Sequence, residues 1–77
     1  MAEISKIDRY IIDKVRERRL ELNITQVDLS LRLEKSDKYI SQFESYKTGR
    51  RYSAFMINEI AKALDCSPRD FWPEKAL

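Results

Sequence analysis

Four polar side chains between residues 37 and 42 have the chemistry needed to recognise the edge of a nucleic-acid base. They are Asp37, Lys38, Ser41 and Gln42. If residues 36–44 form a helix, Ile40 and Phe43 face inward at i, i+3, and the polar groups face outward. Lysine and glutamine can donate to bases in a major groove, and aspartate can accept from cytosine N4. Every surface helix has a polar face, so these residues alone are weak evidence.

Two short amphipathic helices joined by a three-residue turn are expected to position these side chains. The first follows Thr25, an N-cap residue with Asp28 three positions later completing a weak capping box, and it buries Leu29 and Leu33. Ser36 is expected to cap the second helix. Paired short helices with a tight turn are the layout of a DNA-reading helix-turn-helix.

Positive charge is concentrated around the second of these helices. The chain has 15 Lys and Arg against 13 Asp and Glu, and the net charge of +2 does not by itself indicate a nucleic-acid partner. Residues 32–51 hold six cations and three acids, a net +3, so the rest of the chain carries −1. A solvated charge run is the alternative interpretation, but the helix pattern favours a DNA-facing surface.

Residue usage argues against an enzyme, a metal site and a cofactor. The chain has one cysteine, Cys66, no histidine and a single glycine, Gly49. This excludes an internal disulfide, makes a zinc site improbable, and removes the usual nucleophile pairs and the glycine-rich phosphate loops. Carboxylates are interleaved with Lys and Arg at helical spacing, which favours solvated ion pairs over a catalytic dyad.

Apolar runs are too short for a membrane protein. The longest, Ala54 to Ile57, is far below the roughly 20 residues that a membrane span requires, and no basic-then-apolar leader opens the chain. We therefore expect a cytoplasmic protein.

The hydrophobic spacing predicts one all-α domain over residues 1–77, a compact five-helix bundle. Helices are expected at residues 4–22, 25–33, 36–44, 53–64 and 67–72. Asn23 suits the left-handed end of the first helix, Ser53 is expected to cap the fourth, and Pro68 suits the start of the fifth. Phe71 and Trp72 are expected to close the core.

Four stretches between about Ile11 and Trp72 resemble the lambda-repressor-like (XRE/Cro-type) helix-turn-helix DNA-binding family. They are IIDKVRERR, ITQVDLS, SDKYISQFE and EIAKALDCSPRDF. The resemblance implies that Gln26 braces a DNA phosphate, that Arg19 and Glu44 form a structural ion pair, and that the loop from Lys47 to Arg51 contacts phosphates. The full set of expected phosphate contacts is Thr25, Gln26, Tyr39, Lys47, Arg50 and Arg51.

The chain departs from this family in several places. Glu34 stands where the family usually has glycine, and a left-handed Glu would cost about 1 kcal/mol or more. Ser45-Tyr46 replaces the usual Asn-Gly after the second helix. Asp37, expected in the first turn of that helix, would suit the helix dipole but repel phosphate. Val27 and Leu31 lie at i, i+4 on a face that is normally polar, either as incidental exposure or as a protein contact.

The leading hypothesis is a sequence-specific DNA-binding transcriptional regulator that acts as a homodimer, with two reading helices about 34 Å apart on double-stranded DNA. Lys38 and Gln42 would read bases, with Ser41 and Asp37 assisting. Two alternatives remain open. One is an antitoxin-type DNA-binding protein that also binds a toxin, and the other is a protein-interaction module that kept the fold and lost DNA binding.

Overall fold

The structure, a computed structural model, describes residues 4–77 as four α-helices and two short 3-10 helices. The α-helices are α1 (Lys6–Glu21), α2 (Gln26–Arg32), α3 (Tyr39–Glu44) and α4 (Ala54–Ala63), and the 3-10 helices are η1 (Tyr46–Thr48) and η2 (Pro68–Phe71). No residue from 4 to 77 lies in a strand, which confirms the all-α class. Residues 1–3 of the domain expected over 1–77 lie outside the described residues.

The expected fifth helix is a single 3-10 turn, so the bundle has four α-helices over the described residues instead of five. Ser67 caps this turn, and Pro68 occupies its first position as expected. Pro73 then stops the chain from continuing as a helix, because proline lacks an N–H and disfavours helical geometry at Trp72. Only five residues lie between the cap and this stop, and the first four of them form the 3-10 turn.

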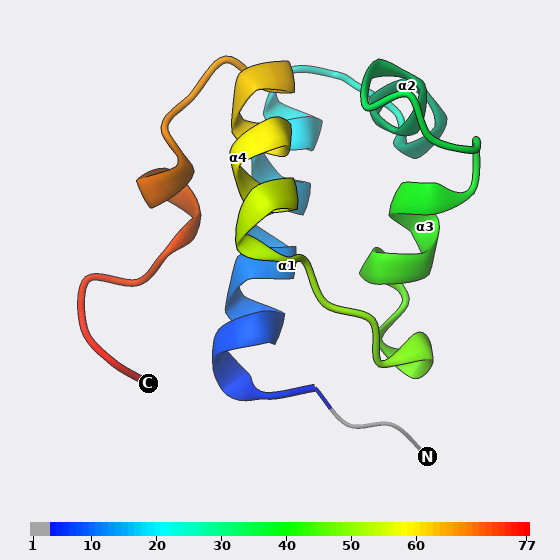
Figure 1. Cartoon of the computed structure of the whole chain (residues 1–77). Coiled ribbons are helices and arrows are strands. Elements are labelled where there is room, and N and C mark those ends of the chain that lie inside the picture. Colours follow the sequence, from blue (N-terminus) through cyan, green and yellow to red (C-terminus); the bar gives the residue numbers. More distant parts are fainter. Residues whose placement is uncertain (1–3) are drawn as a thin grey trace.

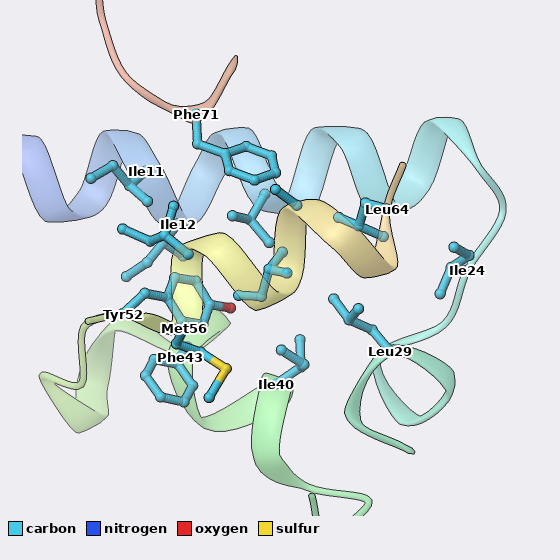
Figure 2. Packing of buried hydrophobic residues seen from close by; sticks show 14 residues of the cluster. Ile11, Ile12, Ile24, Leu29, Ile40, Phe43, Tyr52, Met56, Leu64 and Phe71 are labelled. Carbon is cyan, nitrogen blue, oxygen red and sulfur yellow. The ribbon is translucent and has the colours of Figure 1, made fainter. Parts of the chain in front are cut away.

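One hydrophobic core joins all the elements. Figure 1 shows α4 running alongside the long α1, with α2 and α3 on one side of this pair and the C-terminal segment on the other. Side chains from each element meet between them, among them Ile12, Leu29, Ile40, Phe43 and Phe71 (Figure 2). The inward positions predicted for Leu29, Ile40 and Phe43 are therefore confirmed, whereas Leu33, the C-cap residue of α2, is only partly buried.

Trp72, which was expected to help close the core, lies at the surface instead. Trp72 is 45% exposed, and Phe71, which is 1% exposed, closes the core without it. Leu22 is 39% exposed because it is the C-cap residue of α1, where the chain already turns away from the helix.

Three helices begin at a hydroxyl residue. Ser5, Thr25 and Ser53 precede α1, α2 and α4, and each side-chain oxygen accepts a hydrogen bond from the backbone N–H three residues later, at 3.0 to 3.1 Å. The caps predicted at Thr25 and Ser53 are confirmed. Helix α1 begins at Lys6, later than the expected residue 4, because Ser5 is its N-cap.

The same three helices end at a left-handed residue that is not glycine. Asn23, Glu34 and Asp65 follow α1, α2 and α4 with φ of 56°, 59° and 54°. At the end of α2, Glu34 N–H donates to Leu31 O at 2.9 Å and Lys35 N–H donates to Ser30 O at 3.0 Å, which is the Schellman pattern. The left-handed end predicted at Asn23 is confirmed, and Glu34 takes up the strained conformation.

Among residues 4–77 no helix has the length and apolar character that crossing a membrane would require.

Candidate nucleic-acid interface

Helices α2 and α3 are joined through one buried hydroxyl group. Ser30 is fully buried, donates to the carbonyl of Gln26 at 2.8 Å and accepts from the backbone N–H of Ile40 at 3.0 Å. Beside it, Leu29 and Ile40 are both fully buried. Sequence analysis missed Ser30, although its position at i, i+4 from Gln26, next to a buried leucine, places it on the inner side of α2.

Helix α3 begins at Tyr39, three residues later than expected. A helix starting after Ser36 would need the Ile40 N–H to donate to the carbonyl of residue 36, but this N–H donates to Ser30 Oγ. Ser36 is therefore not the cap, and Lys38 occupies the N-cap position without a side-chain hydrogen bond. The expectation that Asp37 lies in the first turn of α3 is wrong, because Asp37 lies exposed in the preceding turn.

Arg19 of α1 is paired with Glu44, the last residue of α3. Arg19 Nε donates to Glu44 Oε2 at 3.0 Å, and its Nη2 donates to Oε1 at 2.8 Å. The two side chains are 6% and 4% exposed, and Arg19 Nη1 also donates to the carbonyl of Ile24. This bidentate pair fixes the carboxyl end of α3 to α1, as Ser30 fixes the amino end to α2.

Gln26, the first residue of α2, lies beside this pair. Its Nε2 donates to Glu44 Oε1 at 2.9 Å. A primary amide has two N–H donors, so one is held by Glu44 and the other is available for a further acceptor. Thr25 is exposed next to it, and its hydroxyl oxygen accepts from the backbone of α2. The start of α2 therefore presents oriented donors at the surface.

The loop after α3 is anchored to α1 through Tyr46. The Tyr46 hydroxyl donates to Asp13, and the guanidinium of Arg9 lies 4.2 Å from the ring centroid. The hydrogen bond to the Asp13 carboxylate raises the pKa of Tyr46, because losing the proton would place two negative charges together. Tyr46 thus holds the loop where the family's Asn-Gly would stand, and Gly49 supplies a left-handed bend at φ 68°.

The three loop cations have different surroundings. Lys47 is exposed. Arg51 is also exposed, and its Nη1 lies 3.8 Å from Asp8 Oδ2 in the first turn of α1. Arg50 instead lies against α3, because its Nη1 donates to Gln42 Oε1 and its guanidinium lies 4.8 Å from the Phe43 ring centroid. Sequence analysis assigned Arg50 and Gln42 to separate roles, and the structure brings them together.

The remaining expected base-reading residues lie at the amino end of α3. Lys38 and Asp37 are exposed just before the helix. Ser41 is half-buried, and its hydroxyl donates to the carbonyl of Lys38 at 2.8 Å, which leaves its oxygen as an acceptor. Tyr39 is half-buried against the core, with its ring centroid 4.9 Å from that of Phe43.

Among residues 4–77 no group of three or more His, Cys, Asp or Glu side chains is placed to hold a metal ion. Cys66 is half-buried away from α3, and burial raises the pKa of its thiol. The apolar pair on the outer face of α2 is solvent-accessible, with Val27 47% and Leu31 58% exposed.

Comparison with known families and structures agrees with this geometry. The Helix-turn-helix family profile matches residues 15–71. A search of curated proteins finds no match.

Several solved structures share the fold. A hypothetical transcription factor, NHTF from Neisseria, superposes with a TM-score of 0.77 at 16% identity, over 88% of this chain and 76% of that one. The restriction-modification controller protein C.AhdI from Aeromonas hydrophila gives a TM-score of 0.70 at 25% identity, over 82% and 92%. Hydroxypropylphosphonic acid epoxidase from S. wedmorenis gives 0.76 at 16% identity, but only 36% of its chain is covered, so the likeness is to part of a larger enzyme.

Proposed function

The chain belongs to the lambda-repressor-like helix-turn-helix family of DNA-binding regulators, and on that premise we propose that it is a sequence-specific transcriptional regulator reading the major groove with α3. The observation that carries the proposal is the fixation of α3 at both ends. Ser30 holds its amino end and Arg19 holds its carboxyl end, while Lys38 is exposed and Gln42 is half-buried. Such a rigid support is what base recognition requires of a reading helix.

Base contacts would come from the amino end of α3, which is the end that enters the groove in this class of domain. Lys38 is exposed at the N-cap and suits guanine O6 and N7, and Asp37 suits cytosine N4. Ser41 supports these contacts as a short acceptor. Gln42 lies one helical turn after Lys38, and its side-chain oxygen accepts a hydrogen bond from Arg50.

Phosphate contacts would flank the reading helix on two sides. Thr25 and Gln26 lie at the start of α2, where backbone N–H groups and the helix dipole favour an anion. Lys47 and Arg51 follow α3 in the chain, and Tyr39, the first residue of α3, is the remaining phosphate contact that we expect. These contacts carry no sequence information, but they determine how α3 is oriented on the duplex.

We expect two copies of the chain to act together. A helix of six residues spans too few bases to define a unique site, and a two-fold pair would place two such helices about 34 Å apart on one face of the duplex. The likeness to the restriction-modification controller protein C.AhdI, which extends over 92% of that chain at 25% identity, supports a regulatory role for this domain.

Selection of binding sites from a random duplex library tests the proposal. The purified protein is expected to enrich two related half-sites about one helical turn apart, and Lys38→Ala is expected to relax one position in each. The matched control is Arg69→Ala, which removes a cation from η2, a segment on the opposite side of the α1 and α4 pair from α3 (Figure 1), and this variant should enrich the same site as the parent.

A second candidate function rests on the exposed Val27 and Leu31 pair on α2. An antitoxin would use such a surface to bind a toxin while still enriching a DNA site, and an interaction module would use it without DNA. Failure to enrich any duplex would overturn the regulator proposal and leave the interaction module as the alternative.

A further inference from the structure

The Arg50 guanidinium donates a hydrogen bond to the side-chain oxygen of Gln42, one of the two residues expected to read bases. We infer that Arg50 is a specificity-determining residue, which holds the carbonyl oxygen of Gln42 and so directs the Gln42 amide to guanine in preference to adenine. The inference rests on the proposed function, since it concerns the base that α3 selects. It assigns to Arg50 a role different from the phosphate contact that the sequence alone suggested.

The loop between the two residues keeps them together. Gly49 bends the chain in the left-handed conformation, and the Arg50 N–H donates to Thr48 Oγ1 at 3.3 Å. The Thr48 hydroxyl in turn donates to the backbone carbonyl of Gln42. These two hydrogen bonds hold the backbone of the loop against the last turn of α3. The backbone of Arg50 is therefore kept close to Gln42.

The arginine side chain is also held by two aromatic rings. Its guanidinium carbon lies 4.8 Å from the Phe43 ring centroid and 5.8 Å from that of Tyr39. Both distances are within the range of a cation–π contact. Because Phe43 is buried in the core, the ring is a fixed support, and Arg50 is oriented before any DNA arrives.

The chemistry of the two groups determines the orientation of the amide. A guanidinium group has only donors, so the Gln42 atom that faces it must be the carbonyl oxygen. One lone pair of this oxygen is then occupied, and the adjacent positive charge weakens the other as an acceptor. The same polarisation strengthens the amide N–H groups as donors.

The preference for one base follows because the Gln42 amide is left as a stronger donor than acceptor. A free glutamine recognises adenine by accepting from N6 and donating to N7 at the same time. With its oxygen held by Arg50, Gln42 presents mainly donors, and the remaining guanidinium N–H groups add more beside it. The major-groove edge of guanine, with acceptors at both N7 and O6, is the better match.

A set of variants measured on one site tests the inference. The duplex enriched by the parent protein is altered base by base, and affinities are compared for the parent, Arg50→Ala, Gln42→Ala, the double variant and Lys47→Ala. At the position that depends on Gln42, the parent should prefer guanine to adenine. Arg50→Ala should reduce this guanine-to-adenine ratio about tenfold or reverse it, because the freed amide can pair with adenine.

Two control variants distinguish the orientation of Gln42 by Arg50 from the sequence-independent attraction of any cation to DNA. Lys47→Ala removes an equal charge from the same loop, so it should weaken every duplex and leave the ratio unchanged. Arg50→Lys retains a donor that can reach the Gln42 oxygen, so it should preserve the guanine preference while Arg50→Ala loses it. In the double variant both bases should bind equally at this position.

The inference and the proposed function fail in different ways. A parent that enriches a site but prefers adenine at the Gln42 position would overturn the inference alone, as would an Arg50→Ala ratio equal to that of the parent. A Gln42→Ala variant with unchanged preference at every position would do the same. If the parent enriches no duplex at all, the proposed function fails and the inference fails with it.

Discussion

Arg19 and Glu44, 25 residues apart in the sequence, form a bidentate ion pair that is almost inaccessible to solvent, with side chains 6% and 4% exposed. Most of the other ion pairs among residues 4–77 lie nearer the surface. Lys14 and Glu17, for example, lie 3.7 Å apart on the surface of α1 with side chains 37% and 64% exposed. An exposed pair contributes little to folding, whereas breaking a buried one leaves a charge without a partner.

Glu44→Ala is therefore expected to lower the free energy of unfolding by about 3 kcal/mol, because Arg19 would stay buried without its carboxylate. Urea denaturation followed by circular dichroism measures the change. The matched control is Glu17→Ala, which should alter stability by less than about 0.5 kcal/mol. Equal unfolding midpoints for the two variants would contradict the role given to the buried pair.

Glu34→Gly is expected to stabilise the domain. Glu34 has φ 59° at the end of α2, a conformation that costs an ordinary residue about 1 kcal/mol and that glycine adopts freely. Thermal unfolding should shift upward accordingly. Asn23→Gly, at the equivalent position after α1, should give a smaller gain because asparagine tolerates this conformation better. A lower melting temperature for Glu34→Gly would show that the glutamate compensates for its strain elsewhere.

Tyr52→Phe is expected to be neutral or stabilising. The Tyr52 hydroxyl is buried and has no hydrogen-bond partner among residues 4–77, while its ring stacks on Phe43 with centroids 4.4 Å apart. Phenylalanine keeps the stacking and removes the unsatisfied group, which recovers about 1 kcal/mol of desolvation cost. Urea denaturation at neutral pH measures the difference, and a loss of more than about 1 kcal/mol would imply an unrecognised partner for the hydroxyl.

The same variant should change the response to alkaline pH. Burial raises the pKa of Tyr52 above the ordinary value of 10.0, and the nearby Glu44 charge adds to this effect. Above pH 10 the native state keeps a proton that the unfolded chain loses, so stability falls with rising pH by up to about 1.4 kcal/mol per unit. Tyr52→Phe should reduce this slope between pH 10 and 11, and an unchanged slope would argue against the buried phenol.

Lys47→Ala and Arg51→Ala are each expected to weaken binding to all duplexes, because both cations are exposed on the loop beside α3. Losing one phosphate contact should lower the slope of log affinity against log salt by about one unit. Fluorescence anisotropy over a salt series measures this slope. Arg69→Ala on η2 should leave it unchanged, and a new base preference in either loop variant would contradict a pure phosphate role.

Much of the fold was predictable because its causes are local. A hydroxyl residue before an apolar repeat marks a helix start, as at Thr25 and Ser53, and i, i+3 spacing identifies Ile40 and Phe43 as inward positions. The short C-terminal turn shows the limit of such signals. Proline at the first position, as at Pro68, is compatible with either an α-helix or a 3-10 helix. The residues that follow it determine which of the two forms.

The parts that sequence analysis missed depend on contacts between elements. Helix α3 starts late because Ser30, ten residues earlier, accepts the N–H of Ile40. Likewise, the pairing of Arg50 with Gln42 depends on the path of the loop through Gly49, and no local pattern encodes it. The assignment of individual residues to bases and phosphates remains a prediction for the experiments above.

The contacts that hold α3 at its two ends also affect the rate at which the protein would associate with a DNA duplex. Six residues are too few for a stable isolated helix, since peptides shorter than about 12 residues are marginally helical in water. Helix α3 therefore persists only while Ser30 and Arg19 hold its two ends, and its amide hydrogens should exchange with solvent only when the whole domain opens. A duplex thus encounters a surface that is already formed, and the rate of encounter depends on diffusion and ionic strength, with no folding step on the DNA.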